Sequence, residues 1–189
     1  AAPSVGAAVI AAPAGREAEV EAAAEDARGA GELSLTVVAG GATRAASVGA
    51  GLAEVRTDIV AVHDAARPLL TVELIESLLR LLGDRPDAAG AIAARPIADT
   101  VKRVSDAEGR REIERTESRE GLWAAETPQV FRTDALRRAH SADEAASATD
   151  DAMLVERMGG TVLVESAPHP NLKVTTAADA RLAELLLGA

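Results

Sequence analysis

Short apolar runs alternate with longer segments rich in Ala and Glu along most of the chain. The clearest run, residues 58–62, is almost continuously apolar, as a parallel strand buried on both faces would be. Strands that alternate with helices predict a mostly parallel, twisted sheet with helices on both faces. We therefore expect an α/β, Rossmann-like fold for this chain.

The same alternation gives the expected order of elements. Gly and Pro mark several boundaries, for example Pro13 and Gly15 after the first strand. The strands are expected at residues 5–11, 33–38, 58–62, 88–94, 161–164 and 172–174. The helices are expected at residues 16–28, 44–55, 71–82, 133–139, 150–158 and 177–187.

The pattern changes at residues 100–104 and 112–116, where polar and apolar residues alternate around a polar loop. This alternation predicts a β-hairpin that protrudes from the α/β body. An isolated hairpin buries little apolar surface, so it must pack on something, and a second subunit is the natural candidate. We expect a single domain over residues 1–189 with an arm at about residues 99–119, and a homodimer formed through that arm.

Composition excludes several classes of protein. The net charge of −10 and the two aromatic residues argue against a nucleic-acid-binding surface. The sequence contains no run of eighteen apolar residues that would predict a membrane span. It also contains no cysteine to form a disulfide or a thiolate metal site. These features fit a cytoplasmic protein of 189 residues with one sizeable core.

The segment from His63 to Pro68 directly follows the strand at residues 58–62. Asp64 and Arg67 are separated by two alanines, which leave room for a ligand. In open α/β sheets ligands bind outside the carboxyl ends of the strands, so this pair is placed to contact a ligand in a pocket. An Asp/Arg pair at a strand end is also common as a structural ion pair, and the segment alone leaves both interpretations open.

Other polar clusters follow strands in the same way. Two glycines at positions 40 and 41 precede a helix, whose free N–H groups favour anions. Thr149 is a suitable helix N-cap before two acids, so the structural interpretation is favoured there. Lys173 is expected inside a short apolar strand, where a charge must be paired or point into a cleft.

Taken together, the clusters supply cations and hydroxyl groups for a phosphorylated ligand. Nucleotidyl transfer depends mainly on positioning and charge stabilisation, which such groups provide. No nucleophile-and-base pair is visible, and the histidines at 63, 140 and 169 are too scattered to predict a metal site or a catalytic triad. The glycine motifs of dinucleotide-binding and P-loop proteins are absent. The cations are Arg67, Arg119 and Lys173, and the hydroxyl donors are Thr127 and Thr149.

These motifs appear in order in the 2-C-methyl-D-erythritol 4-phosphate cytidylyltransferase family, which the chain resembles from its first residues to its last helix. The motifs are GGATR with Ser47, HDAARP at 63–68, DTVKR at 99–103, LW followed by TPQ at 127–129, TDDA at 149–152, and NLKVT at 171–175. The resemblance implies a nucleotidyltransferase fold and a cytoplasmic, homodimeric transferase. It also implies a Mg²⁺-dependent reaction that joins CTP to methylerythritol phosphate and releases diphosphate, in non-mevalonate isoprene biosynthesis.

The resemblance also assigns roles to single residues. Arg119 and Lys173 would be catalytic, and the acceptor would be bound by Asp64, Arg67, Thr100, Thr127 and Thr149. Gly41, Ala42 and Ser47 would hold the nucleotide, with Ala42 standing where relatives carry Asp. Thr100 and Arg119 would serve the neighbouring subunit. Mg²⁺ would be bound mainly through the phosphates of CTP, without a metal site on the protein.

One part of the family pattern has no counterpart in this sequence. The family opens with a strand, a glycine-rich loop around the CTP phosphates, and an Arg and a Lys that stabilise the transition state, whereas residues 12–16 read APAGR. We expect the 189-residue chain alone to be inactive or nearly so, and its sheet to lack a central piece, since losing a preorganised donor costs several kcal/mol of barrier. Two alternatives stay open: transfer to another polyol phosphate such as ribitol 5-phosphate, and a noncatalytic binding module.

Overall fold

The central sheet has four strands and positions the candidate site. In a computed structural model that describes residues 2–28, 33–107, 109–141, 148–167 and 170–188, the strand order is β3, β7, β4, β8. Strand β7 is antiparallel to both of its neighbours, and β4 is parallel to β8. The strands are β3 (Ile59–Val62), β4 (Gly90–Pro96), β7 (Trp123–Arg132) and β8 (Val162–Ser166).

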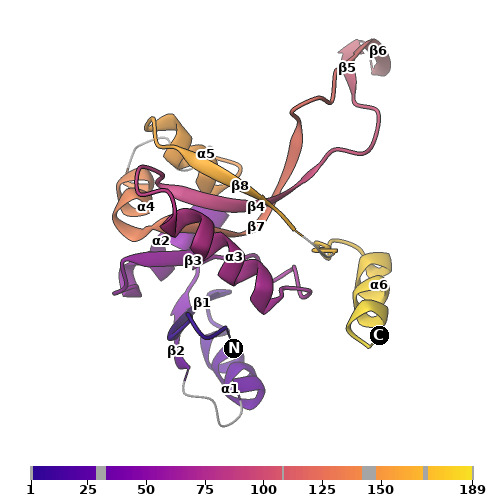
Figure 1. The fold of residues 1–189 in the computed structure, drawn as a ribbon. Coiled ribbons are helices and arrows are strands. Elements are labelled where there is room, and N and C mark those ends of the chain that lie inside the picture. The colour runs from indigo at the N-terminus through magenta and orange to yellow at the C-terminus, as the bar shows by residue number, and fades with distance from the viewer. Residues whose placement is uncertain (1, 29–32, 108, 142–147, 168–169, 189) are drawn as a thin grey trace.

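A second, two-stranded sheet precedes the central one in sequence. Strands β1 (Ala7–Ala12) and β2 (Ser34–Ala39) pair in parallel, and α1 (Glu17–Arg28) lies between them in the chain. Helix α2 (Arg44–Glu54) packs on this sheet and leads into β3 (Figure 1). Within the described residues no ladder joins the two sheets. The expected α/β class is therefore confirmed, with the body strands divided between two sheets and β7 making the central one mixed.

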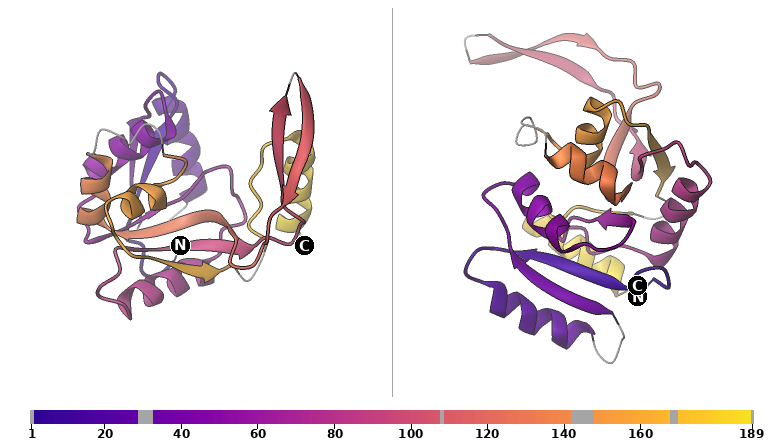
Figure 2. Two further views of the ribbon diagram at one scale, coloured as in Figure 1. Left: turned by 90° about the horizontal axis from the view of Figure 1, so that it is seen from above. Right: turned by 90° about the vertical axis from the view of Figure 1, so that its left-hand side faces the viewer.

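Helices cover both faces of the central sheet, as the sequence predicted (Figure 2). Alternate residues of the buried strands point to opposite faces. One face packs on α2, α4 (Thr133–His140) and α5 (Asp151–Arg157), and Ile92 and Phe131 lie in its core.

The opposite face of the central sheet packs on α3 (Val72–Gly83). Ala91 and Val130 come from the strands, and the helix contributes Leu74, Leu78 and Leu82. These leucines are four residues apart, so they form one apolar stripe along the helix. The two packed faces hold the strands in place, and the ends of those strands carry the polar residues considered below.

The predicted hairpin arm is present and projects away from the body (Figure 1). It consists of β5 (Lys102–Ala107) and β6 (Arg110–Thr116) in antiparallel pairing. The strands extend further toward the turn than predicted, into the loop expected at residues 105–111. Asp106 pairs with Arg111 across the hairpin, and such opposite charges support cross-strand pairing.

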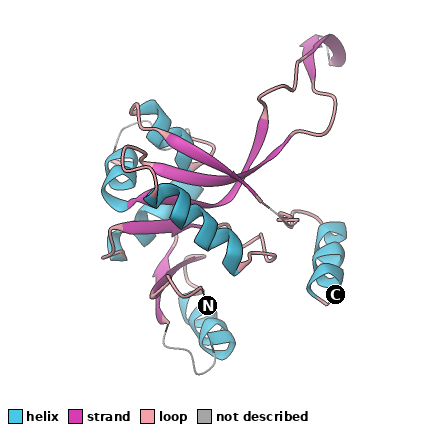
Figure 3. Cartoon of the chain, viewed as in Figure 1, coloured by secondary structure: helices cyan, strands magenta, loops and turns pink. Residues whose placement is uncertain are grey.

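The expected strand at residues 172–174 is wrong. This stretch lies outside any sheet and precedes α6 (Ala177–Leu187), which lies away from both sheets (Figure 3). Val174 N donates to Ala66 O at 2.7 Å, a single backbone bond to a turn rather than a strand ladder. None of the helices that the structure describes has the length and apolar content of a membrane span. His169 lies outside the described residues.

Candidate functional site

A small polar cavity of about 120 Å³ lies where the chain leaves β3, beside the middle of β7 and the start of α5. Pockets for drug-sized ligands usually measure roughly 300–1,000 Å³, so this space suits a phosphate group better than a whole nucleotide. Its walls come from separate stretches of the chain. The lining residues are Arg44, Asp64, Arg67, Ala125, Glu126, Thr127, Gln129, Thr149, Asp150 and Lys173.

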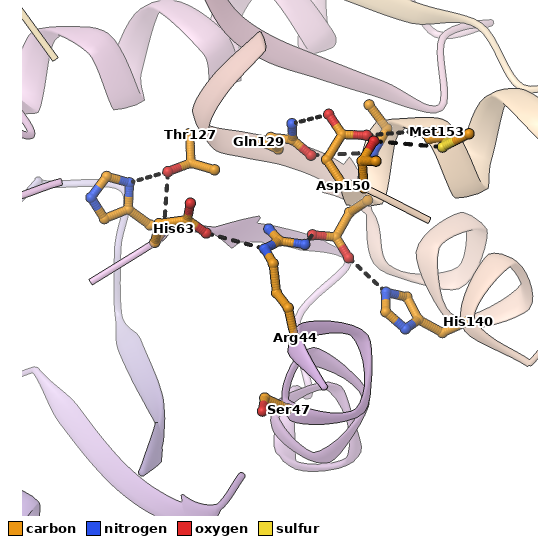
Figure 4. Close-up of polar contacts among 12 residues, drawn as sticks. Arg44, Ser47, His63, Thr127, Gln129, His140, Asp150 and Met153 are labelled. Atoms are coloured by element: carbon orange, nitrogen blue, oxygen red, sulfur yellow. Dashed lines mark hydrogen bonds and ion pairs between the residues drawn. The ribbon is translucent and has the colours of Figure 1, made fainter. Parts of the chain in front are cut away.

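Neutral hydrogen bonds fix the turn after β3. The amide of Asp64 donates to Thr127 Oγ1 at 3.0 Å, and this hydroxyl lies 3.1 Å from His63 Nδ1. His63 Nε2 lies 2.9 Å from the carbonyl oxygen of Arg67, which can only accept. His63 therefore carries its proton on Nε2, and Nδ1 accepts from Thr127 (Figure 4). Burial lowers the pKa of His63, which favours this neutral form.

The segment before α6 closes the cavity from another side. Asn171 is buried and donates its side-chain amide to Thr127 O at 2.6 Å, while Arg67 donates to Asn171 O at 2.6 Å. These bonds hold the segment against β7 and against the turn after β3. They also bring Lys173 to the cavity wall, so the prediction that this charge is paired and faces a cleft is confirmed.

Asp64 lies between two cations. Lys173 Nζ is 2.8 Å from Asp64 Oδ2, and Arg44 Nε is 3.1 Å from Asp64 Oδ1. Burial raises the pKa of Asp64, but the hydrogen bonds and charges of Lys173 and Arg44 outweigh it and hold this pKa below its ordinary value. Asp64 is therefore ionised at neutral pH and partly neutralises both cations.

Arg67 differs from the other cations of the cavity wall. Within the part of the chain that the structure describes, it forms no ion pair with a carboxylate, and its Nε is buried without a hydrogen-bond partner. The interpretation of Asp64 and Arg67 as a structural ion pair is therefore wrong. Among the described residues no carboxylate offsets the charge of Arg67, whereas Asp64 pairs with both Lys173 and Arg44.

Arg44 reaches the cavity from the first turn of α2 and makes a second ion pair there. Its NH1 lies 2.7 Å from Asp151 Oδ2, a contact that is short but poorly aligned for a hydrogen bond, so charge attraction dominates it. Burial lowers the pKa of Arg44, but Asp151 and Asp64 together outweigh it and raise this pKa above its ordinary value. Figure 4 shows the Arg44 side chain between His63 and His140.

Helix α5 begins at the cavity, and its cap differs from the expected one. The N-cap is Asp150 rather than Thr149, because Asp150 Oδ1 accepts from Met153 N at 2.9 Å. Gln129 on β7 donates to Asp150 Oδ2 at 2.9 Å. Thr149 is not needed as a cap, and its hydroxyl stays at the cavity wall with a weak contact to Met153 Sδ at 3.6 Å.

Half of the residues assigned by resemblance line this cavity together. They are Asp64, Arg67, Thr127, Thr149 and Lys173. Arg44, Glu126, Gln129 and Asp150 also line it but were not predicted as site residues. Arg44, Gln129 and Asp150 do stand inside the sequence motifs, and that was the signal available for them. Glu126 is buried and carries no motif signal beyond its position before Thr127.

The three residues assigned to the nucleotide lie together, but outside this cavity. Gly41 donates its amide to Ser47 Oγ at 3.1 Å, and that hydroxyl donates to Thr43 O at 3.0 Å. Ala42 follows Gly41 on the exposed loop before α2. Figure 4 places Ser47 further along α2, away from the contacts of Arg44.

The two residues assigned to the neighbouring subunit also lie outside the cavity. Thr100 and Arg119 are exposed at the base of the arm, and the Arg119 side chain donates to Ala98 O. Among the described residues, no cluster of His, Cys, Asp or Glu is arranged to hold a metal ion.

A family model and curated relatives match this sequence. The family model described as "IspD: 2-C-methyl-D-erythritol 4-phosphate cytidylyltransferase" matches residues 1–189. A relative of that name from Symbiobacterium thermophilum is 46% identical over 155 residues, which is 80% of this chain and 63% of the relative. One from Bacillus licheniformis is 43% identical over 158 residues, which is 82% of this chain and 65% of the relative. The chain thus spans a little under two thirds of the length of these relatives.

Solved structures agree with the sequence relatives. The crystal structure of 2-C-methyl-D-erythritol 4-phosphate cytidylyltransferase from Thermus thermophilus superposes with a TM-score of 0.76 at 32% identity. The superposition covers 96% of this chain and 81% of that one. A crystal structure of a 4-diphosphocytidyl-2C-methyl-D-erythritol synthase gives a TM-score of 0.75 at 34% identity, with the same two coverages. The chain therefore belongs to the 2-C-methyl-D-erythritol 4-phosphate cytidylyltransferase (IspD) family.

Proposed function

We propose that the protein transfers the cytidylyl group of CTP to 2-C-methyl-D-erythritol 4-phosphate and releases diphosphate. The observation that supports this most is the convergence of Arg44, Arg67 and Lys173 on one phosphate-sized cavity beside the end of β3 and the start of α2. Membership of the family supplies the identity of the two substrates. Because CTP is a cytoplasmic metabolite, we place the reaction in the cytoplasm.

The reaction requires no nucleophile from the protein. A phosphate oxygen of the acceptor attacks the α-phosphorus of CTP, and the bond to the diphosphate leaving group breaks. The residues of the cavity then have to hold the acceptor phosphate and offset its charge. Arg67 is suited to this because it has no carboxylate partner among the described residues, and Lys173 offers a point charge from another wall.

Hydroxyl groups of the same cavity would orient the acceptor. Thr149 exposes its hydroxyl at the cavity, free of the capping role that was expected for it. Thr127 acts differently, because both of its hydroxyl contacts go to the turn after β3. We therefore assign Thr149 to direct binding and Thr127 to holding Asp64 in place.

The nucleotide would lie against the loop that contains Gly41, Ala42 and Ser47, with its phosphates directed toward the cavity. Mg²⁺ would arrive as the complex with CTP. The aspartates at the cavity are poor candidates for metal ligands, because Asp64 uses both oxygens on cations and Asp150 uses both on N–H donors. The phosphate oxygens of CTP are then the main ligands of the ion.

We further propose a homodimer in which the arm of one subunit brings Thr100 and Arg119 to the cavity of the other. Val104 and Ile113 are cross-strand partners on the arm, and they are 46% and 64% exposed. A pair of apolar side chains on a projecting hairpin gains stability when a partner covers it. The variant Ile113→Glu should yield monomers in gel filtration and lose activity, whereas Arg110→Gln on the same strand, at a position that pairs with Ala107, should stay dimeric.

The function is tested by measuring diphosphate release from CTP and Mg²⁺ with each of two acceptors. The protein should be produced at the length that its gene specifies, and separately as the 189-residue chain. We expect turnover with methylerythritol phosphate at least about a hundredfold above that with ribitol 5-phosphate. Lys173→Met should lower it about a hundredfold, as loss of one preorganised group does. Arg85→Gln, which removes an exposed cation paired with the nearby Asp87, is the control.

Each outcome bears on a different claim. A preference for ribitol 5-phosphate would overturn the assigned acceptor. CTP binding without turnover on either acceptor, in the protein of natural length, would overturn the transferase assignment and favour a binding module. Near-normal turnover by the 189-residue chain would contradict the expectation that this chain alone is almost inactive.

A further inference from the structure

Arg44 lies at the centre of a line of paired side chains that runs from His140 in the core to Lys173 at the cavity. His140 Nε2 is 2.7 Å from Asp151 Oδ1, and Asp151 Oδ2 is 2.7 Å from Arg44 NH1. Arg44 Nε is 3.1 Å from Asp64 Oδ1, and Asp64 Oδ2 is 2.8 Å from Lys173 Nζ. Each of the two aspartates therefore uses its two oxygens on different partners.

Exposure is lowest at the inner end of this line and highest at the outer end. The side chain of Asp151 is 1% exposed and that of His140 is 8% exposed, whereas Asp64 is 18%, Arg44 34% and Lys173 45% exposed. A buried carboxylate is costly unless it is paired, so Asp151 strongly favours the position in which Arg44 sits beside it. The inner end of the line is thus fixed, and the outer end faces the place where the acceptor phosphate would bind.

We infer that Arg44 is a positioning residue for Lys173 and acts through Asp64. Arg44 occupies Oδ1 of Asp64, so that only Oδ2 is left for the lysine. The carboxylate cannot then turn both oxygens toward the ammonium group. As a result the nitrogen of Lys173 has one defined place, and its charge is only partly neutralised before the ligand arrives.

The geometry also explains why an arginine is suited to this position. A guanidinium group is planar and carries donors on separate nitrogens, so it reaches two carboxylates at once. Lysine has one ammonium group and could pair with only one of Asp151 and Asp64. The inference rests on the proposed function for the identity of the phosphate, but the position of Lys173 can be measured without any turnover.

The 189-residue chain is well suited to that measurement, because its lysines are Lys102 and Lys173 alone. Lys102 lies on the arm and donates to Thr116 Oγ1 at 2.7 Å. In protein labelled with ¹⁵N at lysine, the two ammonium resonances are assigned with Lys102→Arg. We expect Arg44→Gln to shift the resonance of Lys173 and leave that of Lys102 in place. Arg44→Lys, which adds a third ammonium resonance, should shift that of Lys173 less but in the same direction.

The functional readouts are affinity for inorganic phosphate and the kinetics of transfer. We expect Arg44→Gln to weaken phosphate binding and to raise the KM for methylerythritol phosphate, each about tenfold, the change that loss of one charge-assisted contact typically produces. A double-mutant cycle with Asp64→Asn distinguishes an effect of Arg44 that passes through Asp64 from independent effects of the two residues on phosphate affinity and KM. If Arg44 acts through Asp64, Arg44→Gln should have no further effect once Asp64 is replaced, so the double variant should match Asp64→Asn.

Arg137→Gln is the matched control for a purely structural role. Arg137 also ties two elements together, since it donates from α4 to Val55 O at 2.5 Å after the end of α2. The variant Arg137→Gln should lower the free energy of unfolding without moving the Lys173 resonance. If Arg44→Gln behaves like this control, or if the cycle with Asp64→Asn is additive, the inference is overturned. If no transfer occurs in any variant but the Lys173 resonance and phosphate affinity still change, the proposed function fails and the positioning role stands.

Discussion

Lys173 Nζ lies 2.8 Å from Asp64 Oδ2, although 109 residues separate the two in the sequence. The contact joins the segment before α6 to the turn after β3 at the wall of the cavity. A phosphate bound in the cavity would therefore compete with a carboxylate for the lysine. The balance between these two partners sets how tightly a simple anion binds.

Asp64→Asn should strengthen the binding of inorganic phosphate while it weakens cytidylyl transfer. Asparagine keeps the shape of the side chain but releases the charges of Lys173 and Arg44. Partly exposed ion pairs contribute up to about 1 kcal/mol, so we expect phosphate affinity to rise about fivefold, measured by calorimetry. Transfer should fall because the released lysine is no longer held in one place. Unchanged or weaker phosphate binding would contradict this account of Asp64.

Thr127→Val should destabilise the protein by about 1–3 kcal/mol, measured by urea unfolding. Thr127 is buried, and its hydroxyl accepts from Asp64 N and donates to His63 Nδ1. Valine has the same shape but leaves both of those groups without a partner. Phosphate affinity should fall with stability, because the turn that carries Asp64 and Arg67 loses its support.

Thr133→Val is the control for that experiment. Thr133 is also buried, at the start of α4, but its hydroxyl has no hydrogen-bond partner among the described residues. Replacing it should cost little or stabilise the protein slightly, since an unpaired polar group leaves the core. Equal losses in the two variants would show that the hydroxyl contacts of Thr127 contribute nothing specific.

The sequence predicts those parts of the fold that depend on local patterns. The apolar run at residues 58–62 and the Ala-rich helices fall within a few residues of where they were expected. The predicted strand at 172–174 fails because short apolar runs also occur in extended segments, where Asn171 bonds to β7 and Val174 to a turn. Only the tertiary contacts distinguish these two cases.

The residues of the candidate site also differ in how far the sequence alone predicts them. Asp64, Arg67 and Lys173 meet at one cavity. Asp64 and Arg67 were expected at a pocket because they follow a strand, whereas Lys173 was expected inside a strand that does not form. The role of Arg44 is invisible in the sequence, since it depends on Asp151, which lies 107 positions further along the chain and is buried only after α5 packs. The roles assigned to Thr100 and Arg119 depend on the proposed second subunit, and they stay predictions.

Gly41→Ala should weaken CTP binding about tenfold, measured by calorimetry with Mg²⁺ present. A methyl group at this position would meet Ala46 Cβ at 2.3 Å, so the loop before α2 must move away from the helix. Crowding of this kind typically costs about 1–3 kcal/mol. Gly49→Ala is the control, because nothing lies within 4 Å of its added methyl group and alanine favours the helix. CTP affinity that is equal in the two variants would count against the nucleotide loop.

Stability should decrease as the pH falls below about 6.5, the ordinary pKa of histidine, because burial lowers the pKa of His63 in the folded state. Above that pH the ring is neutral in both states and contributes no pH dependence. Below that pH the His63 ring binds a proton in the unfolded chain but stays neutral in the folded protein. This difference favours unfolding by at most about 1.4 kcal/mol per pH unit. The loss continues until the pH reaches the folded pKa.

Urea unfolding at several pH values, together with an NMR titration of the His63 ring, measures this effect. A protonated ring would present a second N–H to Thr127, whose hydroxyl now donates to Nδ1, so the bonds that hold Asp64 N would rearrange. Phosphate affinity should therefore weaken over the same pH range in which His63 titrates in the folded protein. In His63→Gln the pH slope of stability between about 6.5 and the folded pKa should become shallower. A ring that titrates at or above its ordinary pKa would refute the proposed neutral bonding of His63 to Thr127 and Arg67.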